Sequence, residues 1–208
     1  VTAMAHSQAK YVFYFIGDGM GLGHVAATEF YNSQVAKNTT PLLMTTFPYA
    51  TFCYTHSQSS PITDSAAAGT ALACGKKTKN GHVGLSADST TDYTSIASRL
   101  KENGWGVGIV TSVSLDDATP AAFYSHQPSR KMYKEITSDA LKSGFQYLAG
   151  SGFHSGGKDY FSNELKTMFR NAGYDIVQIA DSIECHKGNK LLVIPQKANY
   201  HIGHAIDS

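Results

Sequence analysis

The sequence has no apolar run close to the roughly 20 residues that a helix needs to span a bilayer. It also lacks an excess of charge of either sign, because 17 Lys and Arg residues face 16 Asp and Glu residues, a net charge of +1. Neither nucleic acid nor an anionic membrane surface is therefore expected as a partner. The content of 42% hydrophobic and 16% charged residues is typical of a soluble globular protein.

Cysteine is also scarce. Cys53, Cys74 and Cys185 are too few and too scattered for a disulfide framework or a CxxC zinc site. One disulfide plus a free thiol remains open, but three buried thiols are favoured, since cysteine behaves as a small buried hydrophobe. A signal peptide is lacking, although the small residues of positions 1–9 are typical of segments that flank a cleavage site. We expect positions 1–9 to form a flexible amino terminus.

Strand-like and helix-like segments alternate along the sequence. The β-branched and aromatic run at 10–16 is typical of a buried central strand of a parallel sheet, and 106–111 of another. Further strands are expected at 50–55, 145–148 and 191–194, and helices at 23–35, 64–74, 94–103, 131–141 and 163–171. This alternation predicts an α/β fold with a mostly parallel sheet, formed as a single domain over residues 1–208.

Two glycine-rich segments fall short of nucleotide-binding motifs. The glycines of 17–23 miss the GxGxxG spacing, which needs a further glycine at position 22 or 24. In 69–76, five residues rather than four separate the glycines, which is not the spacing of a P-loop. Neither a dinucleotide nor a nucleoside triphosphate is therefore expected as a ligand.

Asp18 ends the expected strand at 10–16 and stands between two glycines, Gly17 and Gly19. Glycines there allow a sharp turn and leave the carboxylate bare at the carboxyl edge of the sheet. A bound divalent cation is one common way to neutralise such a carboxylate. The spacing alone favours the alternative, a turn aspartate that accepts a hydrogen bond from its own backbone.

Ser65 stands at the expected amino terminus of the helix at 64–74, and three alanines follow it. The helix dipole and the unpaired N–H groups favour an anion there, so a phosphoryl group can lie against Ser65. The alternative is that Asp64 and Ser65 only cap the helix. A serine hydroxyl is a weak nucleophile and no GxSxG motif is present, so a metal ion is the remaining route of activation.

Asp117 and Thr119 offer two oxygen donors two residues apart, with Pro120 stiffening the turn. This arrangement suits a hard cation such as Mg²⁺. The residues alone favour the alternative, a solvated turn rich in aspartate. Arg130 follows a little further on, and arginine binds phosphoryl groups through a bidentate fork.

In order and spacing, these segments resemble the alkaline phosphatases. The resemblance rests on Ile16-Gly-Asp-Gly-Met-Gly21, Thr63-Asp-Ser-Ala-Ala-Ala-Gly-Thr-Ala71, Lys79-Asn-Gly81, Asp117-Ala-Thr-Pro-Ala-Ala122 and Ser129-Arg-Lys131. It implies a three-layer α/β/α sandwich with a mostly parallel central sheet. It also implies metal-dependent hydrolysis of phosphate monoesters through a phosphoserine intermediate.

The same resemblance implies a role for each candidate residue. Ser65 is the phosphorylated nucleophile, Arg130 holds the phosphate, and Asp64 supports both of them. Ser65 also binds metal once its hydroxyl has lost its proton. The bidentate fork of Arg130 further implies a monoester, because a second ester group would displace one of its two contacts.

For the metals, the resemblance implies two Zn²⁺ ions and one Mg²⁺ ion. Asp18 bridges one zinc and the magnesium, Thr119 ligates the magnesium, and Asp117 contacts it through water. Some relatives carry histidine where Asp117 stands. The aspartate therefore indicates the magnesium-using bacterial type.

The remaining ligands of the family are missing from the chain: a Glu-Gly-Gly-x-Ile-Asp-x-x-x-His segment, an Asp-His pair and a late histidine. The chain is therefore expected to be a truncated, amino-terminal portion of a larger domain, without turnover of its own. For the full-length protein, the resemblance implies small-molecule phosphomonoester substrates, export to the periplasm or the medium, and often a homodimer. Two alternatives stay open: a phosphodiesterase or sulfatase-like member of the superfamily, and a catalytically incomplete fragment that binds phosphate or metal.

Overall fold

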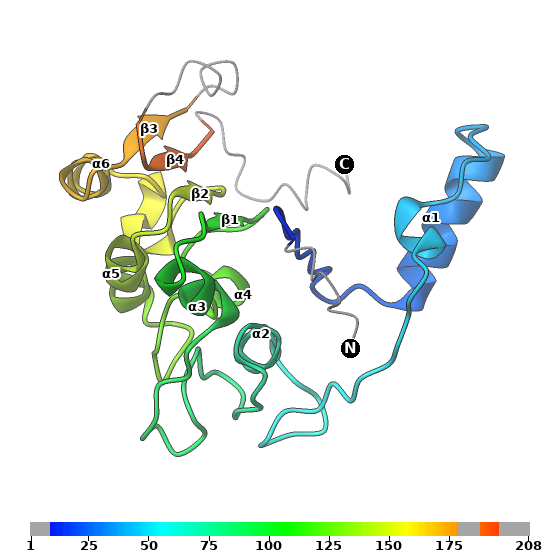
Figure 1. Ribbon diagram of the computed structural model, residues 1–208, viewed down its shortest axis with the longest axis horizontal. Coiled ribbons are helices and arrows are strands. Elements are labelled where there is room, and N and C mark those ends of the chain that lie inside the picture. The colour runs from blue at the N-terminus through cyan, green and yellow to red at the C-terminus, as the bar shows by residue number, and fades with distance from the viewer. Residues whose placement is uncertain (1–8, 179–187, 196–208) are drawn as a thin grey trace, which may run out of the picture. The chain divides into compact units, whose positions relative to one another are not determined.

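The computed structural model describes residues 9–178 and 188–195 of the 208. The chain falls into two compact units, Val1–Cys53 and Tyr54–Ser208, each with its own elements (Figure 1). No helix in the described ranges is long and apolar enough to cross a membrane. The single domain over residues 1–208 stays a prediction, and the expected flexible amino terminus lies almost wholly outside the described residues.

The first unit contains the helix α1 (Leu22–Gln34) and the short 3-10 helix η1 (Leu43–Thr46). The helix expected at 23–35 is therefore confirmed. Glu29 of α1 accepts a hydrogen bond at its Oε1 from the backbone N–H of Leu42 at 2.8 Å. This bond ties the loop after α1 back to the helix.

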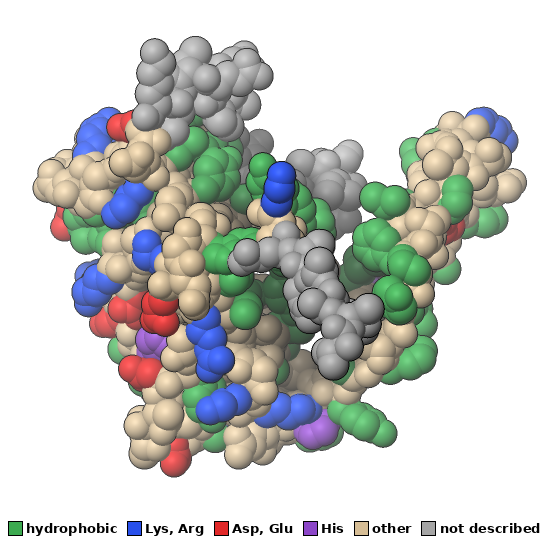
Figure 2. Space-filling model, in the orientation of Figure 1, with side chains coloured by type: hydrophobic (Ala, Val, Ile, Leu, Met, Phe, Trp, Pro, Cys, Tyr) green, Lys and Arg blue, Asp and Glu red, His purple; other side chains and the backbone are tan. Residues whose placement is uncertain are grey.

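Two apolar segments that the sequence predicts as strands, 10–16 and 50–55, are not strands in the structure. Phe13 and Phe52 are 78% and 94% exposed, and Figure 2 shows apolar side chains on the surface that carries α1. Side-chain propensity alone does not make a strand, because the backbone N–H and C=O groups need a neighbouring strand to pair with. Neither segment has such a neighbour in the part of the chain that the structure describes.

The second unit is built on a parallel sheet of four strands in the order β1-β2-β4-β3. The strands are β1 (Gly108–Val110), β2 (Tyr147–Ala149), β3 (Asp175–Val177) and β4 (Leu191–Val193). Three of them lie within or next to the predicted segments 106–111, 145–148 and 191–194. The parallel sheet of an α/β fold is therefore confirmed.

β1 and β3 differ from the sequence-based expectation. The apolar run at 106–111 predicts a buried strand, but β1 lies at the edge of the sheet, and Val110 is 72% exposed. An apolar run reports hydrophobicity and not the place of a strand in the sheet. The sequence does not predict β3, because Asp175–Val177 contains only two consecutive apolar residues, too few to indicate a strand.

Helices alternate with the strands of the second unit. They are α2 (Ser65–Cys74), α3 (Ile96–Glu102), α4 (Ala118–Ala121), α5 (Tyr133–Ser143), the 3-10 helix η2 (His154–Asp159) and α6 (Asn163–Asn171). The four longest confirm the helices predicted there, whereas α4 and η2 are too short for periodicity to reveal. α2 ends at Gly75, whose φ of 68° is the left-handed conformation of the predicted glycine cap.

Aromatic side chains form much of the core of the second unit. The rings of Phe153 and Phe169 lie 5.0 Å apart, and the hydroxyl of Tyr174 donates to the backbone oxygen of Phe145 at 2.8 Å. All four residues are buried. Burial raises the pKa of Tyr174 from 10.0 to about 12, because the phenolate would lose its hydration.

The cysteines do not follow the favoured expectation of three buried thiols. Cys53 is exposed and Cys74 half-buried, and both thiols are free. Cys53 lies in the segment 50–55, which joins no sheet, so the burial expected for it is wrong. Burial raises the pKa of the Cys74 thiol to about 11. Cys185 lies outside the described residues.

Candidate active site

Asp64 and Ser65 begin the helix α2, and Asp64 is held on both of its carboxylate oxygens. Oδ1 accepts a hydrogen bond from the backbone N–H of Ala67 at 2.9 Å, which is the N-cap bond. Oδ2 accepts from the backbone N–H of Gly81 at 3.0 Å. Asp64 is thus the N-cap of α2, and its proposed support of Ser65 and Arg130 stays a prediction. The cap also leaves Ser65, half-buried, at a helix end whose dipole favours an anion.

The small residues of α2 allow a close approach to α4. A Cβ added at Gly69 would lie 3.2 Å from Cβ of Ala122 and 3.4 Å from Cα of Thr119. Any larger side chain at Gly69 would push the two helices apart. The alanine-rich composition of α2 therefore brings the start of this helix close to the segment that carries Asp117 and Thr119.

Arg130 lies between two carboxylates. Its Nη1 is 3.6 Å from Asp64 Oδ2, and its Nη2 is 3.0 Å from Asp117 Oδ1. Its backbone N–H donates to the oxygen of Gly81 at 2.8 Å, so Gly81 contacts both Asp64 and Arg130. A guanidinium carries five N–H donors, so donors remain for an anionic ligand after these two contacts.

Asp117 is the N-cap of α4 rather than part of an irregular turn. Its Oδ1 accepts from the backbone N–H of Ala118 at 2.7 Å as well as from Arg130. Pro120 lies in the first turn of α4, where proline is tolerated because no intrahelical N–H is lost. The other carboxylate oxygen of Asp117, Oδ2, takes no part in the cap bond. Oδ2 lies 3.9 Å from Nε2 of His154.

His154 lies beside the candidate site, and reasoning from the sequence misses it because no metal-binding histidine spacing includes it. Its ring centroid lies 4.6 Å from that of Tyr133 and 5.7 Å from that of Tyr160. The one available signal was its position shortly after the strand expected at 145–148, where parallel sheets place functional residues.

Asp116 fixes the loop that carries His154. Its Oδ1 accepts from the backbone N–H of His154 at 2.7 Å, and its Oδ2 accepts from the N–H of Ser155 at 2.8 Å and from the hydroxyl of Thr137 at 3.2 Å. Asp116 is fully buried. Burial raises the pKa of its carboxyl, and the hydrogen bonds from Ser155 and His154 oppose that rise.

Asp18 belongs to the first unit, in the turn where the N–H of Met20 donates to the oxygen of Gly17 at 3.2 Å. The φ of 68° at Gly19 strongly favours glycine at that position. The predicted turn is therefore confirmed. The role of Asp18 beside the candidates of the second unit stays a prediction.

The described residues include no group of three or more His, Cys, Asp or Glu side chains that could hold a metal ion. Asp117 and Thr119 are brought together at the start of α4 and offer oxygen donors of the kind that Mg²⁺ prefers. Zinc usually takes nitrogen or sulfur ligands as well. The oxygen donors at the start of α4 therefore suit magnesium.

Comparison with known proteins decides the family. The family model for alkaline phosphatase matches residues 9–176. The chain belongs to the alkaline phosphatase family. The tissue-nonspecific alkaline phosphatases of Mus musculus and Homo sapiens are 37% and 35% identical over 161 and 182 residues. These alignments cover 71% and 76% of this chain but 31% and 35% of the relatives, so the chain spans about a third of their length.

Solved alkaline phosphatases share the fold. The cold-active enzyme from Shewanella sp. has a TM-score of 0.76 at 29% identity, over 86% of this chain and 44% of that chain. The Thermus thermophilus enzyme has a TM-score of 0.74 at 28% identity, over 86% and 38%. A histidine-to-aspartate variant of the TAB5 enzyme, solved with magnesium bound, has a TM-score of 0.72 at 28% identity, over 85% and 50%. The expected α/β fold of this family is confirmed.

Proposed function

We propose that this member of the alkaline phosphatase family hydrolyses phosphate monoesters, with Ser65 as the nucleophile. The observation that carries the proposal is the position of Arg130. Its guanidinium lies between the carboxylates of Asp64 and Asp117, and Asp64 directly precedes Ser65 at the start of α2. A serine hydroxyl, a helix amino terminus and an oriented arginine together suit the attack on a phosphoryl group.

The reaction then has two displacements at phosphorus. Ser65 Oγ attacks the phosphorus and loses its proton, the ester oxygen leaves with a proton as the alcohol, and a phosphoserine remains. Water then attacks the same phosphorus and releases phosphate, which restores the serine. In both steps Arg130 and the N–H groups at the start of α2 bind the non-bridging oxygens, where negative charge gathers.

The two carboxylates beside Arg130 act by holding it in place. A guanidinium on a long side chain loses conformational entropy when it grips a ligand. The contacts with Asp64 and Asp117 remove part of that loss before the substrate arrives. A bidentate grip needs two non-bridging oxygens in reach, which supports small phosphomonoesters rather than diesters as substrates.

We further propose that Asp117 and Thr119 hold Mg²⁺. The Zn²⁺ roles that the family resemblance implies for Asp18 and for Ser65, with two such ions in the whole protein, stay proposals. The oxygen donors of α4 support the magnesium assignment, as does the magnesium bound in the TAB5 variant. When bound, such ions neutralise phosphoryl charge and lower the pKa of a coordinated hydroxyl. Export of the protein and its assembly as a homodimer remain proposals from the family resemblance.

The nucleophile is tested by trapping. The full-length gene product is incubated briefly with labelled inorganic phosphate at acid pH, where a phosphoserine persists, and the labelled peptide is sequenced. We expect the label on Ser65 and none in Ser65→Ala, with normal labelling in the control Ser33→Ala, whose side chain lies in α1. Label on another residue, or full phosphatase activity in Ser65→Ala, overturns the assignment.

A further inference from the structure

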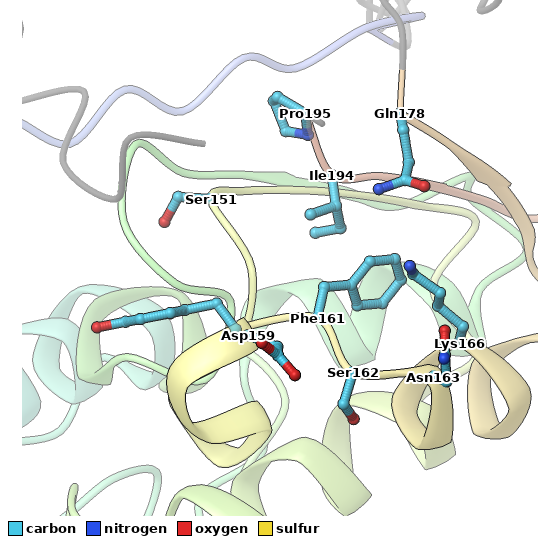
Figure 3. A pocket seen from close by; sticks show the side chains of 10 residues that line it. Ser151, Asp159, Phe161, Ser162, Asn163, Lys166, Gln178, Ile194 and Pro195 are labelled. Atoms are coloured by element: carbon cyan, nitrogen blue, oxygen red, sulfur yellow. The ribbon is translucent and has the colours of Figure 1, made fainter. Parts of the chain in front are cut away.

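The second unit contains a cavity of about 340 Å³ that none of the residues assigned above to catalysis or to metal binding lines. It opens past the carboxyl ends of the strands: Ser151 follows β2, Gln178 follows β3 and Ile194 follows β4 (Figure 3). Its opposite wall is formed by Phe161 and by the first turn of α6. In α/β sheets this edge is where ligands bind, and the volume suits a small organic molecule.

Ser151 gives the first sign of a ligand. The residue is 2% exposed, and its Oγ has no hydrogen-bond partner among the described residues. A buried hydroxyl without a partner is costly, so such a group calls for an explanation. Ser151 lines the cavity, but its Oγ is closed off from it in this rotamer, so the side chain must turn about χ1 before a ligand can supply the missing hydrogen bond.

The backbone around Ser151 cannot move to relieve this cost. Its N–H donates to the oxygen of Val113 at 3.0 Å, and the oxygen of Gly152 accepts from the N–H of Leu115 at 2.8 Å. A Cβ at Gly150 would lie 2.9 Å from Cγ of Leu115. The backbone that carries the hydroxyl is thus held at the cavity wall, and the hydroxyl can move only by rotation about χ1.

Lys166 gives the second sign. Its ammonium lies 5.5 Å from the centre of the Phe161 ring, and within the described ranges it forms no salt bridge. Figure 3 shows this ammonium and the side-chain amide of Gln178 at the same end of the cavity. Lys166 also lies in the first turn of α6, where the helix dipole adds to the positive potential.

We propose that this cavity binds a small organic anion with a flat apolar body. Its carboxylate or phosphate group contacts Lys166 and the amide of Gln178, its body packs between the Phe161 ring and Ile194, and a polar atom bonds to Ser151. Asp159 also lines the cavity, but it is exposed, so water screens its charge. The site does not depend on the chemistry proposed for Ser65.

The test is a ligand-detected NMR titration of the 208-residue chain with benzoate, 3-hydroxybenzoate, phenylphosphonate and neutral benzyl alcohol. We expect saturable binding of at least one anion and affinity about tenfold lower for the alcohol, since a charge-assisted hydrogen bond is lost. Preference between benzoate and phenylphosphonate tells a carboxylate from a phosphate ligand. Lys166→Gln should weaken the binding of the anion about tenfold, and Lys166→Arg, which keeps the charge, should largely restore it.

Two further variants separate this cavity from other anion sites. Ser151→Ala should weaken the binding of 3-hydroxybenzoate, whose ring hydroxyl can bond to Ser151, whereas Lys134→Gln, at an exposed position of α5, should leave it unchanged. A chain that binds none of the probes, or that binds benzyl alcohol as well as benzoate, overturns the proposal. So does binding that survives both Lys166→Gln and Ser151→Ala but is lost in Arg130→Ala, because the anion would then lie beside Ser65.

Discussion

Replacing Asp64 by alanine should destabilise the second unit more than the loss of an ordinary helix cap. The cap bond to the N–H of Ala67 is worth about 1 kcal/mol. The bond that Oδ2 accepts from the N–H of Gly81 involves a charged, partly buried acceptor and adds about 1 kcal/mol after allowance for solvent. The 3.6 Å contact with Arg130 adds up to about 1 kcal/mol. Asp64→Ala should therefore cost about 2–3 kcal/mol.

Two matched variants divide this loss. Asp64→Asn keeps a capping oxygen, because asparagine caps as well as aspartate, but it loses the charge, and its amide nitrogen cannot accept from Gly81. It should cost about half as much as Asp64→Ala. Ser162→Ala removes the N-cap of α6, whose Oγ accepts from the N–H of Leu165 at 3.3 Å, and should cost about 1 kcal/mol.

Urea unfolding followed by the fluorescence of Trp105 measures these differences, since the only tryptophan of the chain lies in the second unit. If Asp64→Ala lowers the free energy of unfolding no more than Ser162→Ala does, then the contacts of Asp64 with Gly81 and Arg130 do not stabilise the fold. The reasoning that this carboxylate holds the anion site together would then be refuted.

Three further outcomes are expected. In the full-length protein, Arg130→Ala should lower kcat/KM for p-nitrophenyl phosphate by about 1.5–3 kcal/mol and harm a diester substrate less; equal losses on both would contradict a bidentate grip. Asp117→His, assayed across magnesium concentrations, should change magnesium activation while Ser65 is still phosphorylated, and an unchanged magnesium response there and in Thr119→Ala would contradict the assignment. The pKa of Tyr174 rises on folding, so its contribution to stability is complete below pH 10.0 and is lost as pH rises toward about 12. Tyr174→Phe should flatten that alkaline loss in urea unfolding measured from pH 9 to 12, and an unchanged slope would show that other groups cause it.

The parts of the fold that the sequence predicts are those fixed by near neighbours. The start of α2 at Ser65 follows from its N-cap, Asp64, which accepts a hydrogen bond from a backbone N–H only three residues on. The end of α2 follows from a glycine that takes a left-handed conformation. Strands depend instead on partners far along the chain. The runs at 10–16 and 50–55 have the residue types of strands but pair with none among the described residues, and β3 pairs although only two of its residues are apolar.

For the candidate site too, the sequence predicts the residues that belong to local motifs but not the contacts between distant segments. Ser65, Asp117 and Arg130 were found because their local segments resemble a family, and the structure places Arg130 against Asp64 and Asp117. The residues alone favoured a solvated turn for Asp117, since nothing within it points to an arginine thirteen positions on. His154 lies 37 positions after Asp117, and only the packing of the loop held by Asp116 brings the two together.

The contact between α2 and α4 through Gly69 also bears on how the nucleophile responds to disturbance. Flexible side chains at an interface between two helices can absorb a small shift of one helix, because they change rotamer. Here the space beside Gly69 is closed by the backbone of Thr119 and by Cβ of Ala122, neither of which can rotate away. A displacement of α4, whether from thermal motion or from an ion bound at Asp117, should therefore shift α2 as well, and with it Ser65 at the start of that helix.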